Sequence, residues 1–300
     1  MKRFSLLIAG LLIALGALAQ GATLFAYPVA PESLPFGRPR ANYIVEHFWD
    51  DMPWKTAHTM PMKMENTLRG FADFLTIASA DTVHRSVNKL IAGARKKAEC
   101  FDALMTMAEA TFYSDTAHLY SDEVYLPFVE AASTFKKLPA ERRERYARQA
   151  RVIKASSEGM TLPAITARRS DGLEFALNDT VSGAMTYVII IEQPGSSRFE
   201  RVRFAANHAV NSLAEAGLIK LMLIYAGEAP EQWWLTTAGL SGSWSVGELP
   251  DAAEWFDLRQ SPGVYLLDGK MTVTAKLMPV DVLIANCENL VNSINRSIVE

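Results

Sequence analysis

The hydrophobic pattern of the chain changes near Ser157, and this change divides the 300 residues into two architectures. Before it, apolar residues recur every three or four positions, which is the spacing that lines one side of an α-helix. Three such stripes are Leu68, Phe71, Leu75 and Ala78; Val87, Leu90, Ile91 and Ala94; and Phe101, Leu104, Met105, Ala108 and Phe112. With further helices predicted over residues 122–136 and after Pro139, residues 42–157 are expected to form an all-α domain of five or six helices.

Residues 158–300 have the pattern of a mixed β-sheet flanked by helices. The turn Ser170-Asp171-Gly172 separates two short alternating runs, which predicts a β-hairpin. Two continuous apolar runs follow at 186–191 and 219–225, and such runs are typical of strands buried on both faces. The remaining predicted elements are helices over 198–216, around Trp233 and from Val280, and strands over 263–267 and 272–277. This order predicts an α/β domain.

The first 41 residues predict export. Lys2 and Arg3 precede an apolar run at 6–15, and Ala17-Leu18-Ala19 is a typical cleavage site, so residues 1–19 are expected to be a signal peptide. An uncleaved anchor is the alternative, but the run is shorter than the ~20 residues of a spanning helix. The proline-rich stretch 20–41 is expected to be extended. We therefore expect a periplasmic or secreted protein of a Gram-negative envelope, with no transmembrane helix in its mature chain.

Composition argues against several kinds of ligand. Lys and Arg number 30 against 33 Asp and Glu, so no basic surface for nucleic acid is expected. No phosphate loop or dinucleotide motif occurs. His47, Asp50, Asp51 and His58 lie near one another in sequence, but their spacing fits no established metal site. No cofactor and no metal are therefore expected. The basic stretch 141–154 indicates either a solvated connecting helix or a contact for an acidic partner.

The second half resembles a thioredoxin-like fold of the secreted, thiol-disulfide-interchange type. The segments that carry this resemblance, in chain order, are 159–163, the turn at 171–172, the strand–loop–helix at 188–203 and 261–268. The first half resembles a helical domain of unknown function that precedes such folds in secreted bacterial proteins, through residues 43–50 and 71–75. Together they imply an α/β thioredoxin-like C-terminal domain behind an all-α domain.

The resemblance also locates a degenerate redox loop. In such proteins a Cys-x-x-Cys begins a helix, whose dipole acidifies the first thiol, and a cis-proline loop opposite holds an extended substrate. Aligning Pro194 with the usual proline puts Ser196 at the position of the nucleophile and Phe199 at that of the resolving cysteine. Ser261 and Pro262 correspond to the cis-proline loop. Dithiol exchange is not expected here, because neither a serine nor a phenylalanine can form a disulfide.

Three functions remain open at this stage. The first is a non-catalytic envelope protein that binds a protein or an extended peptide, with its oligomeric state undetermined. The second is a divergent thiol-disulfide oxidoreductase that uses Cys100 or Cys287, each of which is otherwise expected to be a small buried residue. The third is a structural scaffold. A serine hydrolase built on Ser196 and His208 is disfavoured, because the Gly-x-Ser-x-Gly elbow is missing.

Overall fold

The computed structural model describes residues 22–179, 183–240 and 242–299, so the predicted signal peptide at 1–19 lies outside it. The chain divides into two compact units, Met1–Ala150 and Arg151–Glu300, each of which is described by itself. None of the helices in the described ranges combines the length and the apolar character needed to cross a membrane.

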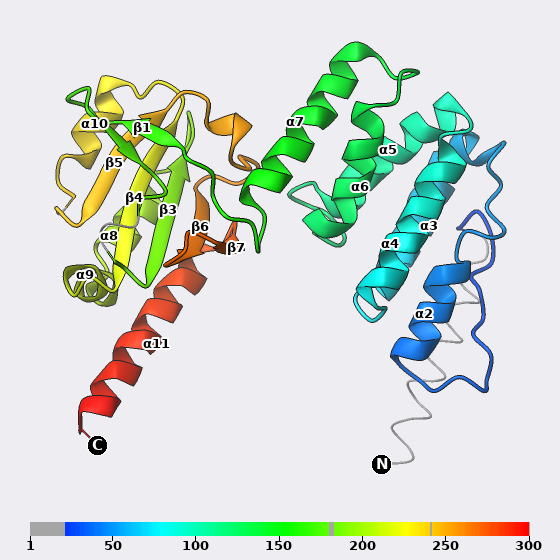
Figure 1. Cartoon of the computed structure of the whole chain (residues 1–300), viewed down its shortest axis with the longest axis horizontal. Helices are drawn as coiled ribbons and strands as arrows, with labels where there is room; N and C mark the ends of the chain where they lie inside the picture. The colour runs from blue at the N-terminus through cyan, green and yellow to red at the C-terminus, as the bar shows by residue number, and fades with distance from the viewer. Residues whose placement is uncertain (1–21, 180–182, 241, 300) are drawn as a thin grey trace. The chain divides into compact units, whose positions relative to one another are not determined.

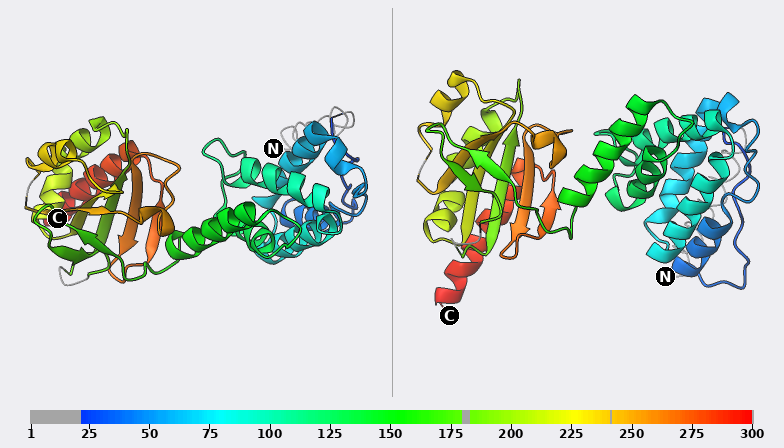
Figure 2. Two further views of the ribbon diagram at one scale, coloured as in Figure 1. Left: turned by 90° about the horizontal axis from the view of Figure 1, so that it is seen from above. Right: turned by 45° about the horizontal axis from the view of Figure 1, so that its top comes forward.

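The described part of the first unit is helical and contains no strand (Figure 2). Its helices are α2 (Arg38–His47), α3 (Pro61–Leu75), α4 (Ala80–Ala94), α5 (Ala98–Phe112), α6 (Asp122–Ser133) and the first part of α7 (Ala140–Ser156), with the short 3₁₀ helix η1 (Ala57–Thr59) before α3. The predicted stripes of α4 and α5 are buried throughout, and Leu68, Phe71 and Leu75 are buried in α3. Packing of these stripes forms the core of the unit, which confirms the predicted helical region.

Helix α2 begins at Arg38, inside the stretch 20–41 that was expected to be extended, so that expectation is wrong for its last residues. Pro39 lies in the first turn of α2. A proline is compatible with this position, since the first amide groups of a helix have no intrahelical acceptor. Pro39 therefore marks the beginning of a helix and not the continuation of an extended segment.

The second unit is built on a seven-stranded mixed sheet with the order β2-β1-β5-β4-β3-β6-β7 (Figure 1). Its strands are β1 (Thr166–Arg168), β2 (Glu174–Ala176), β3 (Thr186–Glu192), β4 (Ile219–Ala226), β5 (Trp244–Leu249), β6 (Gly263–Asp268) and β7 (Val273–Lys276). Strands β3, β4 and β5 run parallel, whereas β1–β2, β1–β5, β3–β6 and β6–β7 are antiparallel. The predicted hairpin and the predicted α/β class are both confirmed.

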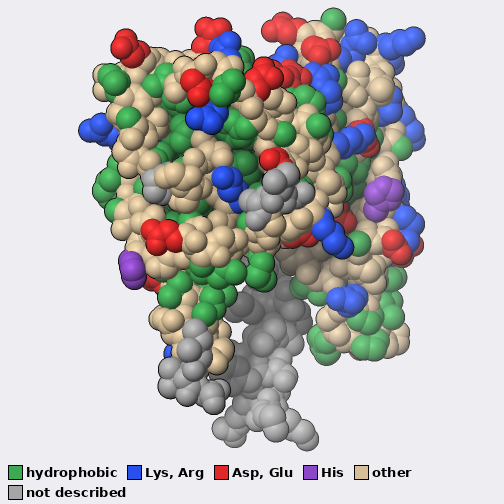
Figure 3. All heavy atoms as spheres, turned by 60° about the vertical axis from the view of Figure 1, so that its left-hand side comes forward, with side chains coloured by type: hydrophobic (Ala, Val, Ile, Leu, Met, Phe, Trp, Pro, Cys, Tyr) green, Lys and Arg blue, Asp and Glu red, His purple; other side chains and the backbone are tan. Residues whose placement is uncertain are grey.

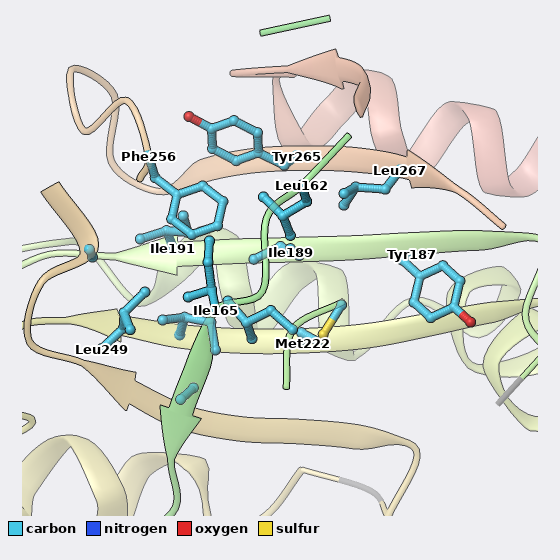
Figure 4. Packing of buried hydrophobic residues seen from close by; sticks show 14 of the residues in the cluster. Leu162, Ile165, Tyr187, Ile189, Ile191, Met222, Leu249, Phe256, Tyr265 and Leu267 are labelled. Carbon is cyan, nitrogen blue, oxygen red and sulfur yellow. The ribbon is translucent and has the colours of Figure 1, made fainter. Parts of the chain in front are cut away.

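Alternate residues of the central strands enter two separate cores, one on each face of the sheet. Tyr187, Ile189 and Ile191 of β3 belong to one cluster, and Val188 and Ile190 belong to the other. In the first cluster, strand residues meet Leu162 and Phe256 from segments outside the sheet (Figure 4). The second cluster contains residues of helices α8 (Phe199–Ala205), α9 (His208–Glu215), α10 (Glu231–Thr237) and α11 (Val280–Val299). Cover on both faces explains why β3 and β4 are continuously apolar.

Two elements differ from the sequence-based prediction. The single helix expected over 198–216 is in fact α8 and α9, because the Asn207 side chain accepts a hydrogen bond from the Val210 N–H at 3.2 Å and so starts a new helix. Strand β5 was not predicted. Its six residues contain Gly247 and Glu248, which weaken the apolar signal of a buried strand.

Candidate functional site

The loop at 193–198, between the end of β3 and the start of α8, is closed by the Ser196 hydroxyl. The Ser196 N–H donates to the Gln193 carbonyl at 2.9 Å, and the Gln193 N–H donates to Ser196 Oγ at 2.7 Å. Gly195 has a φ of 84°, a left-handed conformation that glycine adopts without steric cost. Ser196 is consequently half-buried, with its hydroxyl bound within the loop.

A second loop, residues 257–262, faces the first and leads into β6. Its Ser261–Pro262 peptide bond is cis. The Gln193 side-chain amide donates to the Leu258 carbonyl at 2.7 Å and to the Gln260 carbonyl at 3.1 Å. The hydroxyls of Ser196 and Ser261 also form a hydrogen bond. The two loops that the sequence pointed to are therefore in direct contact, and Gln193, which sequence reasoning missed, contributes most of that contact.

Asp257 anchors the far end of the second loop. Its side chain is 1% exposed and accepts hydrogen bonds from Arg259, including one from Nε at 2.7 Å, while Lys276 Nζ lies 3.3 Å away. Burial opposes ionisation of this carboxyl, but Arg259 and Lys276 outweigh burial and hold its pKa below the usual range. The Asp257 N–H donates to the Tyr265 hydroxyl at 2.8 Å, which ties the loop to β6.

A buried ion pair connects β3 with α8. Glu192 and Arg201 lie 3.0 Å apart, and their side chains are 3% and 2% exposed. Trp233 Nε1 donates to Glu192 at 2.6 Å, and the Arg201 guanidinium donates to Thr236 Oγ1 at 3.0 Å, so both residues also bind α10. Burial raises the pKa of Glu192, although the Trp233 hydrogen bond and Arg201 oppose this. The network fixes α8 and α10 against the end of β3.

The outer side of the site carries apolar side chains and unpaired main-chain groups. Phe199 is 63% exposed, Val202 is 54% exposed on the same helix, and Leu235 of α10 is 63% exposed. No hydrogen bond of the Ser261 main chain is found among the described residues. A free N–H and C=O in an exposed loop can hold an extended polypeptide in the manner of an added strand.

The structure does not bring His208 to Ser196. Ser196 Oγ bonds to Gln193 and Ser261. His208 begins α9 and, with Asn211 and Glu215 of that helix, lines a separate hollow of about 470 Å³. Among the described residues, no histidine is hydrogen-bonded to Ser196 as a base. A serine hydrolase built on Ser196 and His208 is therefore not supported.

The two cysteines lie in different units, Cys100 in α5 and Cys287 in α11, and both thiols are free and buried. Burial raises the pKa of the Cys100 thiol, and it raises that of Cys287 to about 11. The thiolate is the form that attacks disulfides. At neutral pH both side chains are therefore held in the unreactive thiol form, as expected of small buried residues.

The polar side chains between His47 and His58 make local hydrogen bonds and one salt bridge, Lys89–Asp50. His47 Nδ1 lies 2.9 Å from Asp50, and Lys89 also binds Asp50; together they hold the pKa of that carboxyl below its usual range. His58 Nε2 contacts Lys97 Nζ at 3.2 Å. Within residues 22–179, 183–240 and 242–299, no cluster of three or more His, Cys, Asp or Glu side chains could hold a metal ion.

Part of the basic helix α7 is neutralised within the chain. Arg142 pairs with Asp102, and Arg145 pairs with Glu109 at 2.5 Å. On the face drawn in Figure 3, basic and acidic side chains are interspersed, without a broad patch of one sign. The two pairs with Asp102 and Glu109 reduce the net positive charge of this basic stretch.

Comparisons with known proteins agree with this architecture. Residues 16–156 match a family described as "Domain of unknown function (DUF5106)". A thioredoxin-like protein from Bacteroides caccae is 18% identical, covers 88% of this chain and 98% of its own, and superposes with a TM-score of 0.72. A thiol:disulfide interchange protein from a Bacteroides species is 19% identical and covers 46% of this chain and 92% of its own, with a TM-score of 0.37. A search of curated proteins finds no match.

The fold is therefore that of the thioredoxin-like proteins, with a helical region in front of the α/β unit. More particularly, that helical region is the part of the chain that matches the domain of unknown function, and it ends where α7 ends, at Ser156.

Proposed function

We propose that this chain is an exported, non-catalytic protein that binds an extended polypeptide in the cell envelope through a thioredoxin-like domain without a redox cysteine pair. The observation that carries the proposal is the state of Ser196. Its hydroxyl, which the sequence alignment assigns to the position of the nucleophilic thiol, is bound to Gln193 and Ser261. The Ser196 hydroxyl joins two loops, and no base among the described residues activates it. This arrangement favours a binding role over thiol-disulfide exchange.

The binding part of the proposal rests on the Ser261 edge. The main-chain N–H and C=O of Ser261 are not engaged by any described residue, and the loop that carries them is held from both ends by Asp257 and Gln193. A rigid loop loses little conformational entropy when a ligand binds. We expect recognition chiefly through the main chain, with apolar contacts from Phe199.

The redox part is tested by restoring the cysteines. We expect the wild-type chain to show no dithiol-dependent reduction of insulin. We expect Ser196→Cys with Phe199→Cys to acquire it, because the two introduced thiols then form a Cys-x-x-Cys that runs from the loop before α8 to the first residue of that helix. Ser197→Cys with Phe199→Cys is the matched control. If the wild type reduces insulin, and Cys100→Ala with Cys287→Ala abolishes that activity, the oxidoreductase alternative replaces this proposal.

The binding part is tested with a reduced, carboxymethylated polypeptide as the probe. We expect the wild type to bind it, and Ser261→Pro to weaken binding by about tenfold or more, because proline removes the N–H that would pair with the ligand. Unfolding midpoints of both proteins report whether the variant is folded. Equal binding by two folded proteins would rule out the Ser261 edge as the binding site.

Export is tested by mass spectrometry of the protein recovered from the envelope of an expressing Gram-negative host. We expect a mature chain that begins at Gln20, because cleavage is predicted after Ala19. A mass that includes residues 1–19 would instead support the uncleaved anchor.

A further inference from the structure

We infer that Gln193 is a positioning residue that sets the geometry of the Ser261 edge, and that it does so by using its side-chain amide to hold two carbonyls of the opposite loop. This inference rests on the proposed binding function, and it identifies a residue that contacts no ligand but determines how well a ligand can be held.

Gln193 links two loops that lie far apart in sequence, and we call its two side-chain hydrogen bonds to Leu258 and Gln260 the clasp. Its Nε2 donates to the Leu258 carbonyl at 2.7 Å, across 65 residues of chain, and to the Gln260 carbonyl at 3.1 Å, across 67 residues. An amide NH₂ has two hydrogens, so one side chain can satisfy both carbonyls. At the same residue the backbone N–H donates to Ser196 Oγ, which in turn binds Ser261.

This arrangement engages the carbonyls that precede Ser261 in the loop and leaves the main chain of Ser261 able to bind a ligand. The carbonyls of Leu258 and Gln260 are occupied, whereas the main chain of Ser261 has no hydrogen-bond partner in the part of the chain that the structure describes. The clasp therefore determines which main-chain groups face a ligand. It also fixes them in place, and such preorganisation reduces the entropy cost of binding.

The test uses Gln193→Glu in the full chain. The two side chains have nearly the same shape, but a carboxylate cannot donate and would face two carbonyl oxygens. We expect faster hydrogen exchange of the Gln193, Ser196 and Arg259 amides, which donate hydrogen bonds within the two loops. We also expect about tenfold weaker binding of a reduced, carboxymethylated polypeptide, with little change in the unfolding midpoint.

Acidification supplies a readout that a general loss of structure would not give. A protonated carboxyl has one O–H and can donate to one of the two carbonyls. The protection factor, which is the intrinsic exchange rate divided by the observed rate, should therefore partly recover in the variant as the pH is lowered toward 4. The protection factor of the wild type should not increase. Gln232→Glu, on the exposed surface of α10, makes the same chemical change away from the clasp and should match the wild type.

The outcomes separate this inference from the proposed function. If the wild type does not bind the probe, the binding function fails, while the exchange data still report on the clasp. If the wild type binds and Gln193→Glu shows the same exchange and the same affinity, Gln193 is not a positioning residue. Faster exchange with unchanged affinity also overturns the inference, because the clasp would then be irrelevant to binding.

Discussion

Asp257 illustrates how much the site depends on single buried charges. Two cations, Arg259 and Lys276, converge on one carboxylate whose side chain is 1% exposed. Removing one member of such a group leaves a buried charge without a counter-charge. The free-energy cost of that unpaired charge exceeds the net stabilisation that the intact ion pair provides.

We expect Asp257→Asn to lower the free energy of unfolding by about 3 kcal/mol at neutral pH, because the buried Lys276 and the partly buried Arg259 lose their counter-charge. The folded-state pKa of Asp257 is lowered from 3.8, so its stabilising contribution is present above that value and disappears as the pH falls through the lower, folded-state pKa. Urea unfolding between pH 2 and pH 7 should therefore show a shallower acid loss in the variant. An unchanged acid slope would contradict this assignment.

The Glu192–Arg201 pair gives a second prediction at this scale. Arg201→Met should destabilise the chain by about 3–5 kcal/mol, because Glu192 would remain buried without its cation. Burial already raises the pKa of Glu192, and loss of Arg201 would raise it further, so the variant should lose stability as the pH increases above 4.5. Adding Glu192→Gln should recover part of the loss, since an amide oxygen still accepts from Trp233. No recovery in the double variant would show that the charge is not the cause.

At the scale of elements, the break between α8 and α9 depends on Asn207. Asn207→Ala should lower the free energy of unfolding by about 1 kcal/mol, because the cap to the Val210 N–H is lost. Asn289→Ala, at an exposed position of α11, is the control and should change stability by a few tenths of a kcal/mol. Urea titrations of both variants provide the comparison; equal effects would mean that the cap contributes nothing specific.

Local patterns were sufficient to predict most elements of this fold. The stripes of α4 and α5, the Asp171-Gly172 turn, and the apolar runs of β3 and β4 each carry their signal within a few residues. Strand β5 carries a weaker signal, because its burial comes from neighbours in the sheet rather than from its own sequence. The cap at Asn207 could be predicted from the sequence only by interpreting an asparagine inside a helical stretch as the N-cap of a new helix.

The candidate site was only partly accessible from the sequence. Ser196, Ser261 and Pro262 could be located because a resemblance supplied the alignment. Gln193 could not be found in this way, because both of its acceptors are main-chain carbonyls more than 60 residues away, and a carbonyl has no sequence signature. The Glu192–Arg201 pair was not predicted either, because the partners lie on different elements and nothing in the local pattern joins them.

For the molecule as a whole, we expect the two units to unfold separately. Each contains its own buried residues in its own compact contact region, and a domain with its own core can unfold independently. Differential scanning calorimetry should resolve two transitions, and Asp257→Asn should lower only one of them. A single transition that shifts as one would show that the units unfold cooperatively.

Under the export proposed above, the thiols of α5 and α11 are most exposed to oxidation before the chain has folded. An oxidising compartment can join any two accessible cysteines, and only burial in a finished core withdraws them from that chemistry. Because Cys100 and Cys287 belong to different units, each depends on the collapse of its own surroundings for shelter. The order in which those two events occur, relative to the arrival of an oxidant, decides whether the newly translocated polypeptide escapes an unwanted cross-link.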